Sequence, residues 1–529
     1  MQRRRFFASL SLLAAAASAQ GAPTRSRRRT GNRTSTLDAL PLSPAPDASA
    51  ADAVRLYLER IAAIDQRGPR LSSIIETNPD AEAIARTLDA ERRAGKIRGP
   101  LHGKVIVVKD NIATGDRMAT TAGSLALDGV RATRDAFLIA RLREAGAIVL
   151  GKANLSEWAN IRSTRSASGW SARGGLTRNP YALDRSTSGS SSGSAAAVAA
   201  NLAAMAVGTE TDGSIVSPSS INGVVGLKPT VGRVSRDGII PISHTQDTPG
   251  PITRTVADAA LLLAAMAGPD PRDPATLQAP APADYVAALD KNALRGARIG
   301  VAREFFTGHD EIDQQIESAI AQMVLLGAEI VDPIDLPAVN YGDAEGAVLL
   351  HEFKHDLPLW LETFAPHAPV RTLADVIAFN EAHRDREMPY FGQELFTKAQ
   401  ALGDLDSKAY RDALAACVKG AREDGLDHAL RKHQLDAIVA PTGGTSWLTD
   451  FVNGDSNNAG FSTPAAVAGY PHLTVPAGFV RGLPIGLSFV GAAWSEARLL
   501  ALGYAFEQAT QWRREPRFLA QTSMPLAAT

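Results

Sequence analysis

The chain has 529 residues, of which 45% are apolar and 21% are charged, and its formal net charge is −1. This composition is typical of globular proteins, and the balanced charge gives no reason to expect binding to nucleic acid or to an anionic membrane. The single cysteine, Cys417, excludes an internal disulfide.

The N-terminus has the features of an export signal. An arginine cluster beginning at Arg3 precedes two phenylalanines and an apolar run, and residues 17–19 read Ala-Ser-Ala, which is a small-residue cleavage site. The arrangement resembles a twin-arginine signal, and the apolar run is too short to span a bilayer. We predict a cleaved signal peptide at 1–19 and an exported, periplasmic protein that has no stable membrane anchor after cleavage. Residues 20–48, rich in Arg, Thr, Ser and Pro, are predicted to be a disordered linker.

Residues 49–515 are predicted to form one domain, followed by a tail at 516–529. Helical spacing and capping residues predict helices at 49–64, 81–95, 133–146, 195–204 and 255–267, with a helical block at about 343–432. Short continuous apolar runs predict strands at 105–108, 147–150, 205–207, 224–227, 298–301, 329–331, 437–440, 473–475 and 487–490. Because such strands are typically buried on both faces, we expect an α/β fold with a large mixed, mostly parallel central sheet covered by helices on both faces.

One stretch, residues 184–220, combines two turns rich in Gly and Ser with a helix and a strand. The first turn covers 188–194, an alanine-rich helix follows, and the apolar run at 205–207 leads into a second turn at 208–214. A flexible linker would not lead into a helix and a buried strand. We therefore expect hydroxyl groups and backbone N–H groups to be presented at both turns.

The sequences of these turns, Gly-Ser-Ser-Ser-Gly-Ser-Ala-Ala-Ala and Gly-Thr-Glu-Thr-Asp-Gly-Ser-Ile, resemble the amidase signature family of serine hydrolases. The resemblance covers roughly residues 75–510 and is most similar to bacterial peptide amidases. It implies that Ser214 is the nucleophile, that Ser190, 24 positions upstream, is a bridging serine, and that Lys109 is the base. It implies no cofactor and no metal.

The resemblance also implies a mechanism. Neutral Lys109 accepts a proton through Ser190 while Ser214 attacks the amide carbonyl, and the peptide bond between Gly189 and Ser190 is cis. Because the reference pKa of lysine is about 10.4, burial must lower the pKa of Lys109 for it to act as a base. The implied oxyanion hole consists of the backbone N–H groups of Thr211, Asp212, Gly213 and Ser214.

Two positions differ from the usual family pattern. Asp212 stands where many members have glycine, and its side chain either lines the pocket or caps the turn. Val216 stands where members often carry an arginine that could bind a substrate carboxylate. We therefore do not expect a free acid group on the substrate.

Three other motifs suggest different chemistry. The segment 146–152 matches a P-loop except that Ala153 replaces the final hydroxyl residue, and its interior reads as a strand. His351 and His355 match the HExxH pattern of zinc peptidases, but no third ligand has a supporting pattern. Ser191 occupies the centre of a GxSxG motif, but the preceding residues are polar and do not predict the strand that a nucleophile elbow requires.

The predicted function is hydrolysis of a carboxamide C–N bond through a Ser acyl-enzyme, with the C-terminal amide of a peptide as the expected substrate. The alternatives are the amidase subunit of a tRNA-dependent amidotransferase, an aryl or fatty amide hydrolase, a zinc metallopeptidase using residues 351–355, and a non-catalytic binding protein. The partner that we expect is a peptide or small-molecule amide. The helical block at 343–432 is predicted to form the wall or lid of the substrate pocket.

Overall fold

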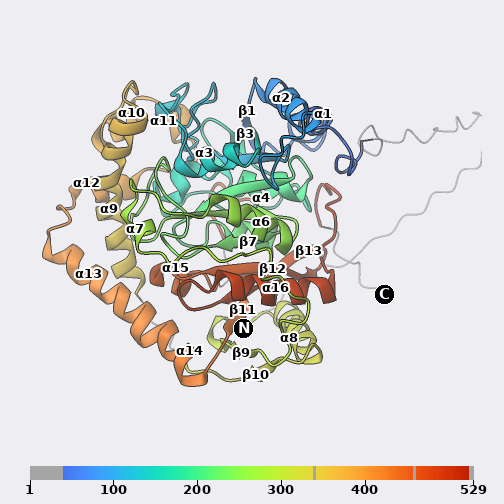
Figure 1. Cartoon of the computed structure of the whole chain (residues 1–529). Helices are drawn as coiled ribbons and strands as arrows, with labels where there is room; N and C mark the ends of the chain where they lie inside the picture. The colour runs from blue at the N-terminus through green and yellow to red at the C-terminus, as the bar shows by residue number, and fades with distance from the viewer. Residues whose placement is uncertain (1–39, 337–340, 457–459, 523–529) are drawn as a thin grey trace, which may run out of the picture. The chain divides into compact units, whose positions relative to one another are not determined.

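The structure is a computed structural model, and it describes residues 40–336, 341–456 and 460–522 (Figure 1). The predicted signal peptide and residues 20–39 of the predicted linker lie outside these residues. The chain separates into two units, Met1–Leu40 and Pro41–Thr529. The fold described below is that of the second unit.

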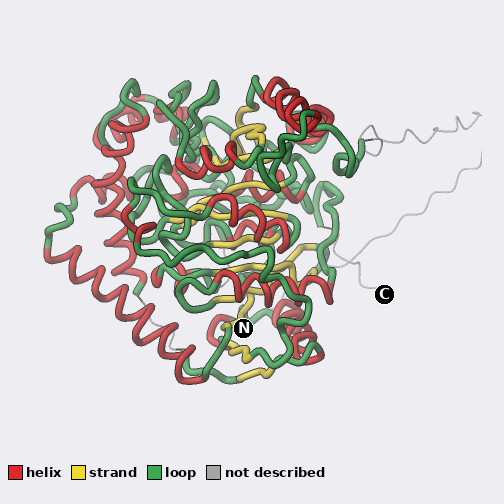
Figure 2. The backbone as a smooth tube through the Cα atoms, viewed as in Figure 1, coloured by secondary structure: helices red, strands yellow, loops and turns green. Residues whose placement is uncertain are grey.

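The second unit is built around a mixed sheet of 11 strands in the order β1-β3-β2-β6-β8-β7-β12-β13-β11-β9-β10. Figure 2 shows these strands in yellow among the red helices. A separate two-stranded sheet pairs β4 (Trp170–Ser171) with β5 (Gly175–Leu176). The strands of the large sheet are β1 (Ile74–Thr77), β2 (Val105–Lys109), β3 (Ile148–Ala153), β6 (Met205–Glu210), β7 (Val225–Lys228), β8 (Thr248–Thr253), β9 (Arg298–Val301), β10 (Glu329–Val331), β11 (Ala437–Pro441), β12 (His472–Val480) and β13 (Leu483–Val490).

The prediction of a mixed α/β sheet flanked by helices is confirmed, but the prediction that it is mostly parallel is wrong. Within the large sheet, as far as the structure describes the chain, six strand pairs are antiparallel and four are parallel. Continuous apolar runs reflect burial on both faces and carry no information about strand direction. Strand β8, which contains Pro249 and Pro251, escaped prediction because prolines weaken the strand signal, and it runs antiparallel between β6 and β7.

The helices agree with most of the predicted ranges, and the block at 343–432 is helical, as predicted. Helices that were not predicted include α5, α8 and α16. The helices are α1 (Ala50–Arg60), α2 (Ala81–Arg93), α3 (Phe137–Glu144), α4 (Ser192–Ala199), α5 (Val216–Ile221), α6 (Val256–Met266), α7 (Pro274–Leu277), α8 (Asp310–Leu325), α9 (Gly342–Phe364), α10 (Leu373–Ala382), α11 (Arg384–Glu387), α12 (Glu394–Ala401), α13 (Lys408–Val418), α14 (Asp427–His433), α15 (Thr463–Ala468) and α16 (Glu496–Thr510). Two π-helical segments, Ile61–Asp65 and Lys419–Leu426, and short 3₁₀ turns complete the list.

Helices cover both faces of the sheet. Every residue of β2 and of β6 is buried. Because successive side chains of a strand point to opposite faces, both faces of the sheet must be covered. Helix α4 packs on β2 and β6, while α6 and α16 pack against each other and on β8 and β12. Helices α9, α10, α12 and α13 pack together along one side of the unit (Figure 1).

The topology brings the predicted site residues to one edge of the sheet. Strand β2 ends at Lys109, and its parallel neighbour β6 ends at Glu210, next to the turn that contains Ser214. Ligand sites of open α/β sheets typically lie at the carboxyl ends of the strands. Within the described residues, no helix is both long and apolar enough to cross a membrane.

Candidate active site

Lys109 is completely buried at the end of β2. Its Nζ lies 2.7 Å from Ser190 Oγ, 2.9 Å from Thr209 Oγ1 and 3.1 Å from the Thr209 carbonyl oxygen. The Nδ2 of Asn111 donates to the same Thr209 hydroxyl at 3.0 Å. Three oxygen atoms therefore fix the position of the amino group, and one of them belongs to the predicted bridging serine.

The environment of Lys109 favours its neutral form. Burial lowers the pKa of Lys109 to about 7, while the carboxylates of Asp247 and Glu210 act in the opposite direction. No arginine or lysine forms a hydrogen bond or an ion pair with Lys109 among the described residues, so desolvation is the cause of the lowered pKa. A large fraction of Lys109 is therefore unprotonated near neutral pH.

Ser190 precedes α4 and is completely buried. The peptide bond between Gly189 and Ser190 is cis. A Cβ added at Gly189 would lie 2.1 Å from Ser156 Oγ, so no larger residue fits at this position. The carbonyl oxygen of Ser190 accepts from the backbone N–H of Ser156 at 3.1 Å, which holds the Ser190 backbone against the neighbouring segment.

Ser214 lies in the turn between β6 and α5, and it is 7% exposed. The backbone N–H of Ser191 donates to the Ser214 carbonyl oxygen at 3.1 Å, which connects the two Gly/Ser turns. At Gly213 the backbone has φ +76°, a left-handed conformation that glycine adopts without strain. One Glu210 oxygen accepts from the backbone N–H groups of Ile215 and Val216 at 2.7 and 3.0 Å. This buried carboxylate therefore fixes the backbone directly after Ser214.

The same turn presents free hydrogen-bond donors. Among the residues that the structure describes, none of the four backbone N–H groups of Thr211–Ser214 donates to a protein acceptor. Unpaired N–H groups in a buried turn are rare in proteins and are the groups that an oxyanion hole requires. The geometry is thus suited to binding a negatively charged oxygen beside Ser214.

A second layer of residues, which the sequence did not reveal, supports this turn. The Asp247 carboxylate accepts from Thr211 Oγ1 at 2.6 Å and from the backbone N–H groups of Ile242 and Ser243. Gln246 Nε2 donates to the Thr211 carbonyl oxygen at 3.3 Å and to Glu345 Oε1 at 2.9 Å. These residues carry no motif. Glu210, the last residue of β6, is an acidic residue shortly after an apolar run, and this position is a sequence signal for a buried carboxylate.

A cavity of about 520 Å³ opens onto Ser214. Its lining is mostly polar, Trp447 is the aromatic side chain in it, and no histidine lines it. The lining residues are Ala159, Asn160, Ser168, Ser188, Gly189, Asp212, Gly213, Ser214, Ser217, Thr442, Trp447, Asp455, Gly460, Ser462 and Thr463. Asp212 therefore lines the cavity, and its Oδ2 also accepts from Thr463 Oγ1 at 2.6 Å.

Comparison with known proteins identifies the family. The model of the family described as Amidase matches residues 52–500. The chain belongs to the amidase family. A probable amidase of Arabidopsis thaliana is 42% identical over 479 residues, with 88% of each chain covered. The native peptide amidase of Stenotrophomonas maltophilia, a solved structure, is 53% identical with a TM-score of 0.86, covering 89% of this chain and 96% of that one.

Other amidase-family relatives have a different role. A protein from Halorhodospira halophila that is named as a subunit of glutamyl-tRNA(Gln) amidotransferase is 37% identical over 485 residues, covering 85% of this chain and 93% of that protein. The resemblance to the amidase signature family is thus confirmed, and so is the prediction of an amidase. Membership of the family does not determine which amide is cleaved.

The prediction that residues 343–432 form the wall of the cavity is wrong, and their role as a lid stays a prediction. None of the lining residues comes from that range. Apart from those in the stretch 184–220, the lining residues come from segments that the strand and helix patterns did not single out, namely Ala159, Asn160, Ser168, Thr442, Trp447, Asp455, Gly460, Ser462 and Thr463. The helical block contacts the site indirectly, because Glu345 on α9 accepts from Gln246 Nε2, which also donates to the Thr211 carbonyl oxygen.

The competing motifs have structural roles in the amidase fold. Lys152 of the P-loop-like segment lies within strand β3, and its Nζ donates to the Ile112 carbonyl oxygen at 2.5 Å and to Thr120 Oγ1 at 2.9 Å. Ser191 of the GxSxG motif is buried, and its Oγ donates to the Thr209 carbonyl oxygen at 3.1 Å. Neither residue lines the cavity.

The two histidines of the HExxH motif contact different groups, and His355 Nδ1 lies 2.7 Å from Asp356 Oδ1. His351 Nδ1 lies 2.7 Å from the Ala347 carbonyl oxygen. Among the described residues, the group that could bind a metal is instead His244, Glu352 and Asp356. The two ring nitrogens of His244 face different carboxylates, at 2.8 Å from Asp356 and 3.5 Å from Glu352, which suits a protonated imidazole better than a metal ion. The zinc peptidase alternative therefore has no support in the structure.

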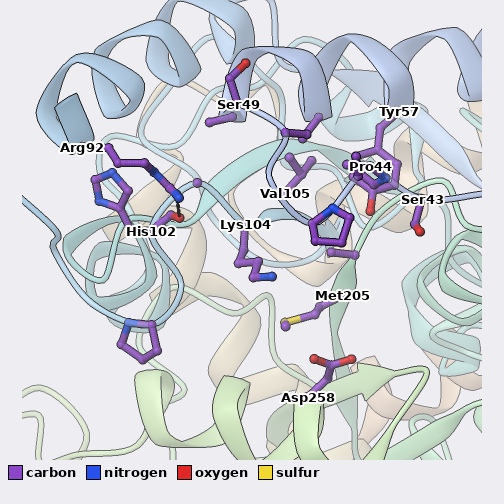
Figure 3. Close-up of a pocket in the computed structure, with 18 of the residues that line it drawn as sticks. Ser43, Pro44, Ser49, Tyr57, Arg92, His102, Lys104, Val105, Met205 and Asp258 are labelled. Atoms are coloured by element: carbon purple, nitrogen blue, oxygen red, sulfur yellow. Dashed lines mark hydrogen bonds between the residues drawn. The ribbon is translucent and has the colours of Figure 1, made fainter.

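A second cavity, of about 450 Å³, lies at the opposite end of the strands (Figure 3). Val105 and Met205, the first residues of β2 and β6, line it together with Tyr57, His102 and Lys104. A strand of five residues separates its ends by roughly 13 Å. This cavity is therefore distinct from the site at Lys109 and Ser214.

Proposed function

We propose that this amidase hydrolyses the C-terminal carboxamide of peptides to the free acid and ammonia, using a relay of Lys109, Ser190 and Ser214. The observation that carries the proposal is the 2.7 Å contact between the buried Lys109 Nζ and Ser190 Oγ, beside a turn with four N–H groups that have no acceptor in the described part of the chain. The 53% identity to a solved structure named peptide amidase supports this substrate class.

The relay begins with a neutral Lys109. A neutral amine has two N–H groups and one lone pair, and the two Thr209 oxygens occupy two donor directions of Nζ. The lone pair is then left to accept the proton of Ser190 Oγ. Ser190 in turn accepts the proton of Ser214 Oγ as that oxygen attacks the carboxamide carbon.

The remaining steps use the same groups. The oxyanion accepts hydrogen bonds from the turn Thr211–Ser214, and loss of one such donor typically costs about 2.7–4 kcal/mol of transition-state stabilisation. The Lys109 ammonium returns its proton through Ser190 to the nitrogen, the C–N bond breaks, and ammonia leaves. Water then attacks the acyl-enzyme, gives its proton to the relay, and releases the acid and Ser214.

The second candidate function is that of an amidotransferase component, since such proteins are among the relatives. Three features favour the peptide amidase function: the export-type N-terminus, the balanced charge, and Val216 in place of the arginine that could bind a carboxylate. An aryl or fatty amide hydrolase would need an apolar cavity, whereas the lining here is mostly polar.

Substrate comparison tests the proposed function. We expect ammonia release from a short peptide amide, and no reaction with the same peptide as a free acid. A fatty amide and an aryl amide should react much more slowly, because the polar lining offers them little apolar surface. Faster hydrolysis of the fatty or aryl amide would retain the amidase chemistry and reject the peptide substrate. A requirement for a partner protein would favour the amidotransferase.

We further propose that the enzyme is exported by the twin-arginine route, with a mature N-terminus near Gln20. Replacing Arg3 and Arg4 by lysine retains the positive charge of the segment but removes the arginine pair. We expect this variant to accumulate as precursor in the cytoplasm, measured by fractionation and N-terminal sequencing. Unchanged export of the variant would argue for the general secretory route.

A further inference from the structure

Asp455 holds a fixed carboxylate at the cavity that opens onto Ser214. Trp447 Nε1 donates to Asp455 Oδ1 at 3.1 Å, and the backbone N–H of Ser168 contacts both carboxylate oxygens at 3.2 and 3.1 Å. The residue itself is exposed and lines the cavity. A carboxylate offers about four acceptor positions, so these contacts leave capacity for a ligand.

The charges around this carboxylate are unbalanced. Asp455 forms no ion pair among the described residues, and no lysine, arginine or histidine occurs among the fifteen lining residues. Asp212 is the second acidic residue in the lining. The buried Lys228 acts on Asp212 and partly balances its charge, whereas no cation is seen to act on Asp455 among the described residues. Lys109 does not cancel the charge of Asp455, because the proposed mechanism requires Lys109 to be neutral.

We infer that Asp455 determines the charge preference of the enzyme, so that peptide amides with a cationic residue near the scissile carboxamide react faster than those with an anionic residue. This inference rests on the proposed function and names its substrate class more closely. A carboxylate in a partly enclosed cavity attracts cations and repels anions more strongly than it would in bulk water. The same charge repels the product carboxylate and so favours its release.

The test measures kcat/KM for acetylated dipeptide amides that carry Lys, Gln or Glu at either of the two positions before the amide. Acetylation removes the N-terminal charge, so only the side-chain charge varies. We expect the wild-type enzyme to prefer Lys over Glu at one position or both. Asp455→Asn can retain an acceptor for Trp447 and Ser168 but removes the charge, and we expect the Lys/Glu ratio to fall about tenfold.

The neutral Gln substrate corrects for any loss that is common to all three substrates. Asp450→Asn is the matched control, because Asp450 lies in the same loop, binds the backbone N–H groups of Val452 and Asn453, and does not line the cavity. We expect that control to leave the Lys/Glu ratio unchanged at equal ionic strength.

Three results would overturn the inference: an unchanged ratio in Asp455→Asn, an equal loss with all three substrates, or the same change in Asp450→Asn. Each of these presupposes a wild-type enzyme that releases ammonia from peptide amides. If the wild-type enzyme releases none from any of them, the proposed function itself fails. The two failures are therefore distinguishable in one experiment.

Discussion

Replacing Ser214 by alanine is expected to abolish amide hydrolysis and to leave the fold intact. The substitution removes the attacking oxygen, and in serine hydrolases such a loss lowers kcat by roughly 10⁴–10⁶-fold. The Ser214 hydroxyl has no hydrogen-bond partner among the described residues, and the bond from Ser191 is to the Ser214 backbone, which alanine keeps. Ammonia release and a thermal melt would measure both outcomes.

Non-additivity provides the control for this result. Lys109→Ala and Ser190→Ala should each remove most of the activity, because in the proposed relay the three residues pass one proton. Adding either substitution to Ser214→Ala should cause little further loss, since groups that act as a unit are not additive. Near-normal turnover by Ser214→Ala would reject the assignment of the nucleophile, and additive losses would reject the relay.

The proximity of the three residues of the proposed relay could be predicted because each has a local signal, whereas their catalytic roles stay a prediction. Lys109 ends a continuous apolar run, and Ser190 and Ser214 lie in short Gly/Ser turns whose text resembles a known family. Strands that consist of such runs were also placed well, with β9 and β10 at their predicted bounds. Local patterns of this kind depend on burial and turn chemistry, which the sequence encodes directly.

The supporting residues could not be predicted, because their roles depend on contacts between distant segments. Asp247 and Thr211 form a hydrogen bond although they are 36 positions apart in the sequence, and Asp455 and Ser168 do so at a separation of 287 positions. Nothing near either aspartate in the sequence indicates a partner. The strand directions in the sheet and the composition of the cavity wall also depend on contacts between distant segments, and the predictions of a mostly parallel sheet and of a helical cavity wall were wrong.

The pH dependence of the amidase is expected to report Lys109. Because the pKa of Lys109 is about 7 and its neutral form is the proposed base, kcat/KM should fall as the pH drops below about 7. The loss should approach about tenfold per pH unit, which gives about 100-fold at pH 5. Initial rates of ammonia release from a neutral peptide amide, measured in buffers of constant ionic strength, would give this profile.

Protonation of Lys109 would not cause the loss of activity at acid pH by destabilising the folded protein. Its folded-state pKa, about 7, lies below its ordinary value of 10.5, so the unfolded chain binds more protons than the native protein between these two values. The free energy of unfolding therefore rises with pH across that window. Below about pH 7 both states are protonated at this residue, and Lys109 causes no further change in stability.

Removing a charge beside Lys109 tests whether the titration of Lys109 causes the acid limb of the pH profile. The carboxylates that act on Lys109 are those of Asp247 and Glu210, and both favour the ammonium form. Asp247→Asn removes one negative charge, so the pKa of Lys109 should fall and the acid limb should move to lower pH. The altered contact with Thr211 should lower the plateau but not move the limb. A limb that stays in place or moves to higher pH would show that a group other than Lys109 titrates.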